Sequence, residues 1–116
     1  MPDGSKAEQV IAIAKQYVGV PYVYGGTTPS GWDCSGYIAF VYDKVGVNLP
    51  RTSGAQKAAG TVVSASEAKP GDLVFSPGHI GIYAGNGMMY DAGSPSSGTS
   101  CRSHSWMGSV TYIRVL

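Results

Sequence analysis

The sequence has 116 residues and a formal net charge of +1, from 8 basic and 7 acidic side chains. This balance argues against a nucleic-acid-binding surface or a polybasic membrane arm, and no apolar run reaches the roughly 18 residues of a membrane span. Charged residues are 13% and hydrophobic residues 43% of the chain, which excludes the disorder caused by high charge and low hydrophobicity.

We expect one globular domain over residues 1–116, because this length is typical of a single domain and too short for two. Residues 1–4 are interpreted as a flexible end or as an addition to the natural chain. The first five residues also lack the basic and apolar regions of a signal peptide. The two cysteines, Cys34 and Cys101, are too few for a disulfide scaffold.

The first predicted helix begins at a capping box, in which Ser5 is the N-cap and Glu8 reaches back to it. Gly19 is expected to end this helix. Apolar residues recur along it at three- and four-residue steps: Ala7, Val10, Ile11, Ala14, Tyr17 and Val18. Residues 20–32 are expected to form an extended piece and then a loop, because two adjacent glycines and a proline interrupt them.

The most informative local pattern surrounds Cys34. Asp33 is a favourable N-cap, so Cys34 becomes the first residue of a helix that ends at Gly46. The buried stripe of this helix is expected to contain Cys34, Tyr37, Ile38, Val41 and Val45. A thiol at a helix N-terminus lies at the positive end of the macrodipole, which favours the thiolate and therefore a nucleophile. The alternative is a structural cysteine, since free cysteine is among the most buried residue types.

Turns and short strands dominate the second half of the chain. A further capping box, Ser53 with Gln56, predicts a short helix ending at Gly60, and residues 69–72 have the composition of a type II turn. Strands are expected at 73–75, 79–84, 88–92 and 110–116, with a Ser/Gly-rich loop at 93–105. Helices first and antiparallel strands second indicate an α+β fold, with the helices packed on one side of a small antiparallel sheet.

The expected hairpin of strands 79–84 and 88–92 brings two polar residues together. A three-residue loop, Gly85-Asn86-Gly87, would place Gly81 opposite Asp91 and His79 diagonally across from Asp91 on one sheet face. A two-residue loop would reverse the parity and separate them. With the longer loop, His79 is a base, Asp91 is its orienting group and Cys34 is the nucleophile.

Five segments resemble the NlpC/p60 cysteine peptidases: Pro21–Gly26, Asp33–Tyr37, Leu49–Ser53 with Gln56, Lys69–Phe75 and Gly78–Gly85. The resemblance covers residues 7–116 and implies a papain-like fold, with the nucleophile at Cys34 and the base at His79. The family's third catalytic position is often His and sometimes Glu, Asn or Gln. It lies twelve residues after the first histidine and falls here on Asp91. The family's active-site tyrosine falls on Tyr22, which would support the oxyanion.

The resemblance also implies a reaction and a substrate. The reaction is hydrolysis of cell-wall stem peptides between γ-D-glutamate and a diamino acid, commonly meso-diaminopimelate, through a thioester on the cysteine. Substrate contacts are implied for Asp33 and Ser35. Arg51 and Ser53 are candidates for binding a carboxylate-rich stem peptide, although a plain surface arginine is an equal alternative.

No metal or cofactor is expected. Cys101 and His104 form a Cys-x-x-His pair, but together with Cys34 and His79 their spacings match no familiar zinc arrangement. A disulfide between the two cysteines would require an oxidising compartment and would disable the nucleophile. We therefore interpret Cys101 and His104 as loop residues without a catalytic role.

Three alternative functions are left open. The same chemistry could cut the N-acetylmuramoyl–L-alanine amide or the peptide cross-bridge. The same fold could serve as an antibacterial toxin, or the chain could be a catalytically silent wall-binding module, although the intact Cys34, His79 and Asp91 argue against that last function. The resemblance implies an extracellular, cell-wall or periplasmic location. We expect a monomer that binds no nucleic acid, with other domains in a longer parent chain.

Overall fold

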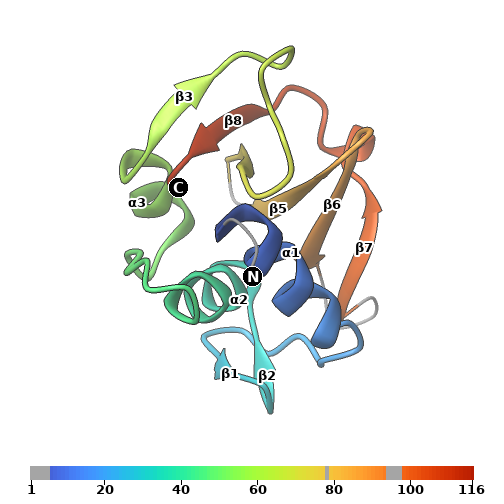
Figure 1. The fold of residues 1–116 in the computed structure, drawn as a ribbon. Helices are drawn as coiled ribbons and strands as arrows, with labels where there is room; N and C mark the ends of the chain where they lie inside the picture. Colours follow the sequence, from blue (N-terminus) through green and yellow to red (C-terminus); the bar gives the residue numbers. More distant parts are fainter. Residues whose placement is uncertain (1–5, 78, 94–97) are drawn as a thin grey trace.

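The computed structural model describes residues 6–77, 79–93 and 98–116. Figure 1 shows the chain passing from helices to strands, in the order expected from the sequence. The elements are α1 (Lys6–Gln16), β1 (Thr27–Thr28), β2 (Gly31–Trp32), α2 (Cys34–Asp43), α3 (Ser53–Ala58), β3 (Thr61–Val63), β4 (Leu73–Ser76), β5 (His79–Gly85), β6 (Met88–Ala92), β7 (Thr99–Ser103), the 3-10 helix η1 (Ser105–Met107) and β8 (Thr111–Arg114).

Six strands form one antiparallel sheet in the order β3-β8-β4-β5-β6-β7, and β1 pairs with β2 in a separate small hairpin. Figure 1 shows α1 and α2 in front of the sheet and the small hairpin below α2. Strand β8 comes last in the chain but pairs with both β3 and β4, which ties the C-terminal segment into the sheet. The expected α+β class is confirmed.

Helix α2 lies within the hydrophobic core. Its residues Tyr37, Ile38 and Val41 are fully buried and share one apolar cluster with inward-facing residues of the sheet such as Ile82. The stripe expected from the sequence is therefore present, except that Cys34 at its start is only half-buried. The first residue of the helix thus lies at the edge of the core and is partly exposed to solvent.

Helix α1 differs from the expectation at its C-terminal end. It stops at Gln16, and Gly19 then adopts a positive φ of 101°. Val10 and Ala14 are buried as expected, whereas Val18 is 50% exposed because it lies beyond the last helical turn. The expected N-cap, Ser5, lies outside the described residues.

The expected cap of α3 is wrong by one residue. Thr52 is the N-cap and its hydroxyl accepts from the Ala55 N–H at 3.3 Å. Gln56 does not reach back to the cap, because its fully buried amide donates to the carbonyl oxygens of Ser35 at 2.9 Å and Pro50 at 2.8 Å. Gln56 therefore fastens α3 to the first turn of α2.

The hairpin loop is also shorter than expected, but the strand register is correct. Only Asn86 and Gly87 lie between β5 and β6, and both have positive φ, 55° and 76°. This is the geometry of a two-residue type I′ turn. A β-bulge between Tyr83 and Gly85 adds one residue to β5, so Ile82 still pairs with Tyr90. The bulge restores the parity that a two-residue loop alone would have reversed.

Two edge strands were not expected. Residues 99–103, interpreted as part of a loop, form β7 against β6, and residues 61–63 form β3 against β8. Strand β7, Thr-Ser-Cys-Arg-Ser, lies at the edge of the sheet. Its sequence lacks the alternation of apolar and polar residues that would have predicted a strand. Its pairing with β6 places Arg102 directly opposite Met89, on the face that also carries Asp91.

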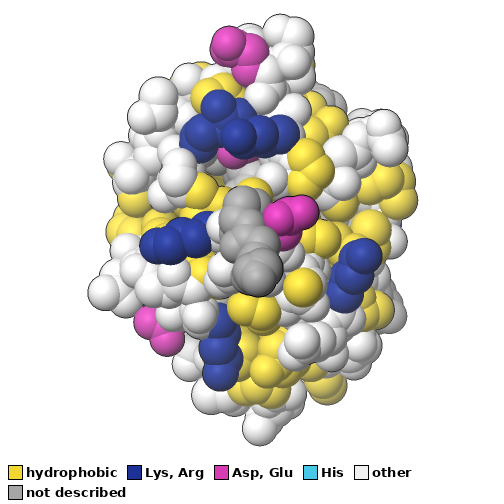
Figure 2. Space-filling model, viewed as in Figure 1, with side chains coloured by type: hydrophobic (Ala, Val, Ile, Leu, Met, Phe, Trp, Pro, Cys, Tyr) yellow, Lys and Arg dark blue, Asp and Glu magenta, His cyan; other side chains and the backbone are white. Residues whose placement is uncertain are grey.

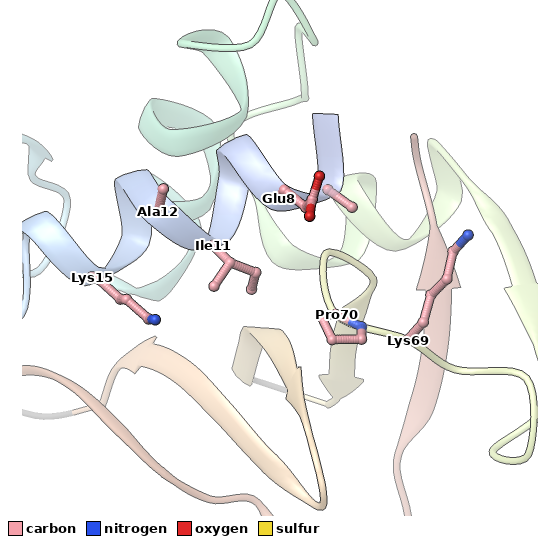
Figure 3. A pocket seen from close by; sticks show the side chains of 7 residues that line it. Glu8, Ile11, Ala12, Lys15, Lys69 and Pro70 are labelled. Atoms are coloured by element: carbon pink, nitrogen blue, oxygen red, sulfur yellow. The ribbon is translucent and has the colours of Figure 1, made fainter. Parts of the chain in front are cut away.

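Helices α1 and α2 lie on the face that Figure 2 shows. Figure 2 shows its Lys and Arg side chains in separate groups between hydrophobic and uncharged areas. A hollow of about 580 Å³ lies between α1 and the 69–70 turn, and Figure 3 shows Ile11 and Pro70 between Lys15 and Lys69 at its ends. The described residues lining it supply no thiol or imidazole. In the described ranges, no helix has both the length and the hydrophobicity needed to cross a bilayer.

Candidate active site

The half-buried thiol of Cys34 stands on the first residue of α2, as the sequence predicts. Asp33 is the N-cap, with its carboxylate accepting from the Gly36 N–H at 2.8 Å and from the Gly25 N–H at 3.0 Å. The same carboxylate therefore fixes the helix terminus and the preceding glycine loop. The N-terminus of a helix is the positive end of its macrodipole, so this position favours negative charge at the thiol.

His79 lies on β5 and its ring Nε2 is 2.6 Å from Oδ2 of Asp91 on β6. The Asp91 carboxylate is completely buried and the His79 side chain is 13% exposed. Gly81 lies between them on the same strand, and a Cβ there would come within 3.2 Å of the Asp91 Cβ. The diagonal contact expected from the hairpin register is therefore present, and the glycine leaves room for it.

The His79 imidazole connects this strand pair to Cys34. Burial lowers its pKa, but hydrogen bonds with Asp91 and Cys34, together with the negative charges of both groups, raise it further. The resulting pKa of His79 is about 9, so the ring is an imidazolium at neutral pH. Since Nε2 faces Asp91, the other ring nitrogen is left for the thiol. The three residues form a nucleophile, an acid–base group and an orienting group in contact.

Arg102 is a site residue that the sequence analysis missed. Its Nε donates to Oδ1 of Asp91 at 3.0 Å and its terminal nitrogen donates to Oδ2 at 2.7 Å. Burial raises the pKa of Asp91, but hydrogen bonds from His79 and Arg102 lower it below its usual value. The pairing of residues 99–103 with β6 would have indicated Arg102, because it places this residue diagonally across from Asp91. The sequence analysis assigned this segment to a loop and therefore did not consider the pairing.

A hollow of about 400 Å³ lies in front of Cys34. It brings together all the other residues expected to contact substrate or to support the oxyanion. Its lining is Tyr22, Tyr24, Gly25, Asp33, Cys34, Ser35, Arg51, Thr52 and Ser53. Burial and the nearby charges of Cys34 and Asp33 raise the pKa of Tyr22, so its phenol keeps its proton and can donate a hydrogen bond.

Arg51 is not an isolated surface arginine. Its guanidinium donates to Oδ2 of Asp33 at 3.1 Å and to the Ser35 hydroxyl at 2.7 Å. Burial raises the pKa of Asp33, but the hydrogen bonds from Arg51 and from the Gly36 and Gly25 N–H groups outweigh it and hold the pKa below its usual value. Arg51 therefore helps to order the N-terminus of α2 while its side chain stays 41% exposed toward the hollow.

Cys101 and His104 have partners other than the catalytic candidates, and the partner of Cys101 is Tyr90, directly opposite it on β6. Cys101 is an exposed free thiol on β7, and both cysteines are unpaired. His104 contacts the Tyr112 hydroxyl through Nε2 at 3.1 Å and packs edgewise against the same ring. Within the described ranges, no three potential ligands gather as a metal site would require.

Comparison with known proteins decides the family. The model described as "NlpC/P60 family" matches residues 19–114. The chain belongs to this family. Over 88 residues it is 51% identical to "Probable endopeptidase p60" of Listeria monocytogenes, which covers 72% of this chain and 18% of that protein. Over 94 residues it is 43% identical to the "Bifunctional muramidase/DL-endopeptidase CwlT" of Bacillus subtilis, which covers 73% of this chain and 29% of that protein.

Solved NlpC/p60 domains share the fold over nearly the whole chain. The NlpC/p60 domain of the peptidoglycan hydrolase SagA has a TM-score of 0.85 and 38% identity, covering 93% of this chain and 97% of that domain. RipD of Mycobacterium tuberculosis has a TM-score of 0.86 and 27% identity, covering 98% of this chain and 100% of the RipD chain. RipD is described as a non-catalytic NlpC/p60 domain protein adapted to peptidoglycan binding, so membership of the family does not by itself establish catalysis.

Proposed function

We propose that this chain is a peptidoglycan hydrolase, a cysteine endopeptidase that cleaves stem peptides between γ-D-glutamate and meso-diaminopimelate. The contact of Cys34, His79 and Asp91 carries the proposal, because it joins a helix-terminal thiol to an imidazolium held by a buried carboxylate. A protein that only binds the cell wall has no need of this arrangement. The DL-endopeptidase name of CwlT supports the choice of bond.

The reaction begins when the Cys34 thiolate attacks the carbonyl carbon of the γ-D-glutamyl bond. The negative charge that forms on the carbonyl oxygen is stabilised by the Cys34 N–H and the Tyr22 hydroxyl. His79 then gives its proton to the diaminopimelate nitrogen, the carbon–nitrogen bond breaks and a thioester remains on Cys34. Next, His79 takes a proton from water, the resulting hydroxide attacks the thioester, and the acid and the free thiolate are released. Asp91 keeps the imidazole oriented through both steps.

The hollow in front of Cys34 suits a short charged peptide. Arg51 offers its exposed guanidinium to a carboxylate of the stem peptide, and Ser53, the first residue of α3, lines the same hollow. Asp33 and Ser35 contribute an acceptor and a hydroxyl to the same wall. A peptidoglycan substrate supports an extracellular, cell-wall or periplasmic location for the chain. Since it spans 18% of the p60 length, we propose that it works beside other domains of a longer protein.

The test is mass spectrometry of fragments released from purified peptidoglycan by the wild-type chain, by Cys34→Ala and by Cys34→Ser. The wild type should release fragments that end in D-glutamate and fragments that begin with diaminopimelate. Cys34→Ala should release neither kind of fragment, and Cys34→Ser should release only traces of them. Both variants should keep the wild-type circular dichroism spectrum. Fragments that begin with L-alanine would instead show an amidase, and cleaved cross-bridges would show a cross-bridge peptidase.

A wall-binding module without catalysis is the second candidate, because RipD shows that the same fold can serve this function. It predicts that the wild type and Cys34→Ala sediment equally with cell-wall sacculi and that neither releases fragments. Release of fragments that depends on Cys34 contradicts it.

A further inference from the structure

The Asp91 carboxylate has two cationic neighbours. His79 contacts Oδ2 from β5, and Arg102 contacts both carboxylate oxygens from β7. The three side chains lie in a diagonal row across three adjacent strands, because β6 pairs with β5 on one side and β7 on the other. Asp91 is completely buried, whereas the Arg102 side chain is 32% exposed.

The catalytic cycle creates an electrostatic difficulty at this carboxylate. While His79 is an imidazolium, its charge balances that of Asp91. Without Arg102, Asp91 would become a buried charge with no counter-ion when His79 gives its proton to the leaving amine, and such a charge is costly. The carboxylate would then hold the proton on His79 and slow the transfer. A permanent positive charge on the opposite side of the carboxylate removes this cost.

We propose that Arg102 is a positioning residue for catalysis, which fixes the Asp91 carboxylate with a two-pronged hydrogen bond and balances its charge when His79 loses its proton. The inference rests on the proposed cysteine peptidase function. Among the described residues, the charged groups that act on the pKa of His79 are Cys34 from α2 and Asp91 from β6. Arg102 faces Asp91 from β7 and therefore acts on His79 through it. A family member with a neutral amide or imidazole in place of Asp91 would have no need of such an arginine.

A second arginine of the same sheet provides a matched control. Arg114 on β8 makes the same two-pronged contact with Asp72, at 3.0 and 2.9 Å, and its side chain is 30% exposed. Neither Arg114 nor Asp72 lines the hollow in front of Cys34 or contacts His79 or Asp91 in the described structure. Arg114→Gln therefore removes an equivalent ion pair without touching the candidate site.

The first measurement is the hydrolysis of a purified stem peptide by four variants: Arg102→Gln, Arg114→Gln, Asp91→Ala and Asp91→Ala with Arg102→Gln. Arg102→Gln should lower kcat about tenfold with little change in KM, while Arg114→Gln keeps the wild-type kcat. In the Asp91→Ala background, Arg102→Gln should lower kcat less than about twofold, because the residue through which it acts is absent. An equal loss in both backgrounds, or no loss in either, overturns the inference.

The second measurement needs no substrate. The rate at which iodoacetamide alkylates Cys34 is followed against pH by mass spectrometry of the Cys34 peptide, because the exposed Cys101 also reacts. The alkaline transition at Cys34 then reports the loss of the His79 proton. Arg102→Gln should move this transition to higher pH, since a positive charge near the imidazolium is lost. Arg102→Lys keeps the charge and should leave the transition near the wild-type position, with part of the kcat recovered. Arg114→Gln should also leave it unmoved.

The two measurements separate the inference from the function on which it rests. If the wild type hydrolyses no stem peptide, the proposed function fails, and the alkylation profiles still test the action of Arg102 on His79. If the wild type hydrolyses the peptide but the Arg102→Gln transition stays in place or moves to lower pH, the inference fails alone.

Discussion

The resemblance to NlpC/p60 peptidases implies a third catalytic position at Asp91, often occupied by an imidazole and sometimes by Glu, Asn or Gln. An aspartate brings a full negative charge into a completely buried position, beside His79 at 2.6 Å. That charge strengthens the hold on the imidazolium more than a neutral amide would, because charge-assisted hydrogen bonds are stronger than neutral ones. We therefore expect catalysis in this chain to depend strongly on the charge of Asp91.

Replacing Asp91 tests this dependence. Asp91→Ala should lower kcat by about two to four orders of magnitude, with a smaller change in KM, because the lost interaction strengthens in the transition state. Asp91→Asn should lose less, since the amide still orients the ring but does not stabilise its charge. The measurement is steady-state hydrolysis of a stem peptide. Near-wild-type kcat in Asp91→Ala would remove this residue from the mechanism.

In the proposed mechanism, the pKa of His79 should set an upper pH limit for activity. The ring must be protonated to act on the leaving amine, and its pKa is about 9 because Asp91 and Cys34 outweigh the effect of burial. The value of kcat/KM should therefore fall as pH rises through about 9. In Asp91→Ala this fall should move down toward the ordinary imidazole pKa near 6.5. Equal alkaline transitions in the two proteins would contradict the assigned cause.

Residue types and spacing were enough to predict the contact of His79 with Asp91 and the placement of Cys34 at a helix N-terminus. They were not enough to predict Arg102. A charged residue in a Ser/Gly-rich stretch shows no periodicity, and its partner became apparent only when residues 99–103 paired with β6. The ion pair of Arg51 with Asp33 was not predicted for a similar reason, since only the tertiary fold brings the two residues together.

Among the elements, the first turn of α2 depends on an unusually close approach. Gly36 lies against the loop that precedes the helix, and a Cβ at this position would be 2.1 Å from the Gly26 carbonyl oxygen. The closest atom belongs to the backbone and the next is Oδ1 of Asp33 at 3.0 Å, which is held in place as the helix cap, so neither moves away easily. The loop and the helix terminus together form the wall that holds Cys34, so this contact sets the shape of the site.

Gly36→Ala should therefore lower the free energy of unfolding by about 2 kcal/mol or more and reduce hydrolysis, because overpacking displaces the loop from the helix. Gly54→Ala is the matched control, since Gly54 lies in α3 with open space around its Cα. That control should be neutral or stabilising by about 0.5–1 kcal/mol. Urea unfolding measures both. Equal stabilities for the two variants would show that the loop around Gly26 moves away from the added methyl group at little cost.

The β5–β6 hairpin shows that two different turns can give the same strand register. Gly85-Asn86-Gly87 was interpreted as a three-residue loop, whereas Asn86 and Gly87 form the turn and a bulge between Tyr83 and Gly85 supplies the third residue. Both arrangements give the same parity, so His79 and Asp91 share a face in either. Sequence alone does not separate them, because a glycine with positive φ fits both a loop and a bulge.

Across the whole molecule, all three arginines pair with buried aspartates. Arg51 pairs with Asp33 at the start of α2, Arg102 with Asp91 across β6 and β7, and Arg114 with Asp72 at the start of β4. The side chains of these aspartates are at most 11% exposed. In a chain with only 13% charged residues, these pairs fasten the helix cap and the sheet to their surroundings. Folding therefore buries carboxylates that must remain ionised.

This burial gives the stability of the fold a defined acid dependence. Burial alone would raise the pKa of Asp33 and Asp91, but their hydrogen bonds lower both values below those of the unfolded chain. The stability that they contribute is therefore present above the unfolded pKa, near 3.9, and is lost as pH falls through the lower folded values. The free energy of unfolding, measured with urea between pH 6 and pH 2.5, should decrease as the pH falls below about 4.

Asp91→Asn should lower stability at neutral pH, because Arg102 loses its charged partner. It should also make the loss of stability in acid less steep, by the contribution of about one proton. Asp43→Asn, at an exposed position of α2, is the control and should keep the wild-type slope. If Asp91→Asn and the wild type declined with the same slope, the Asp91 carboxylate would not be the group that the folded protein holds ionised.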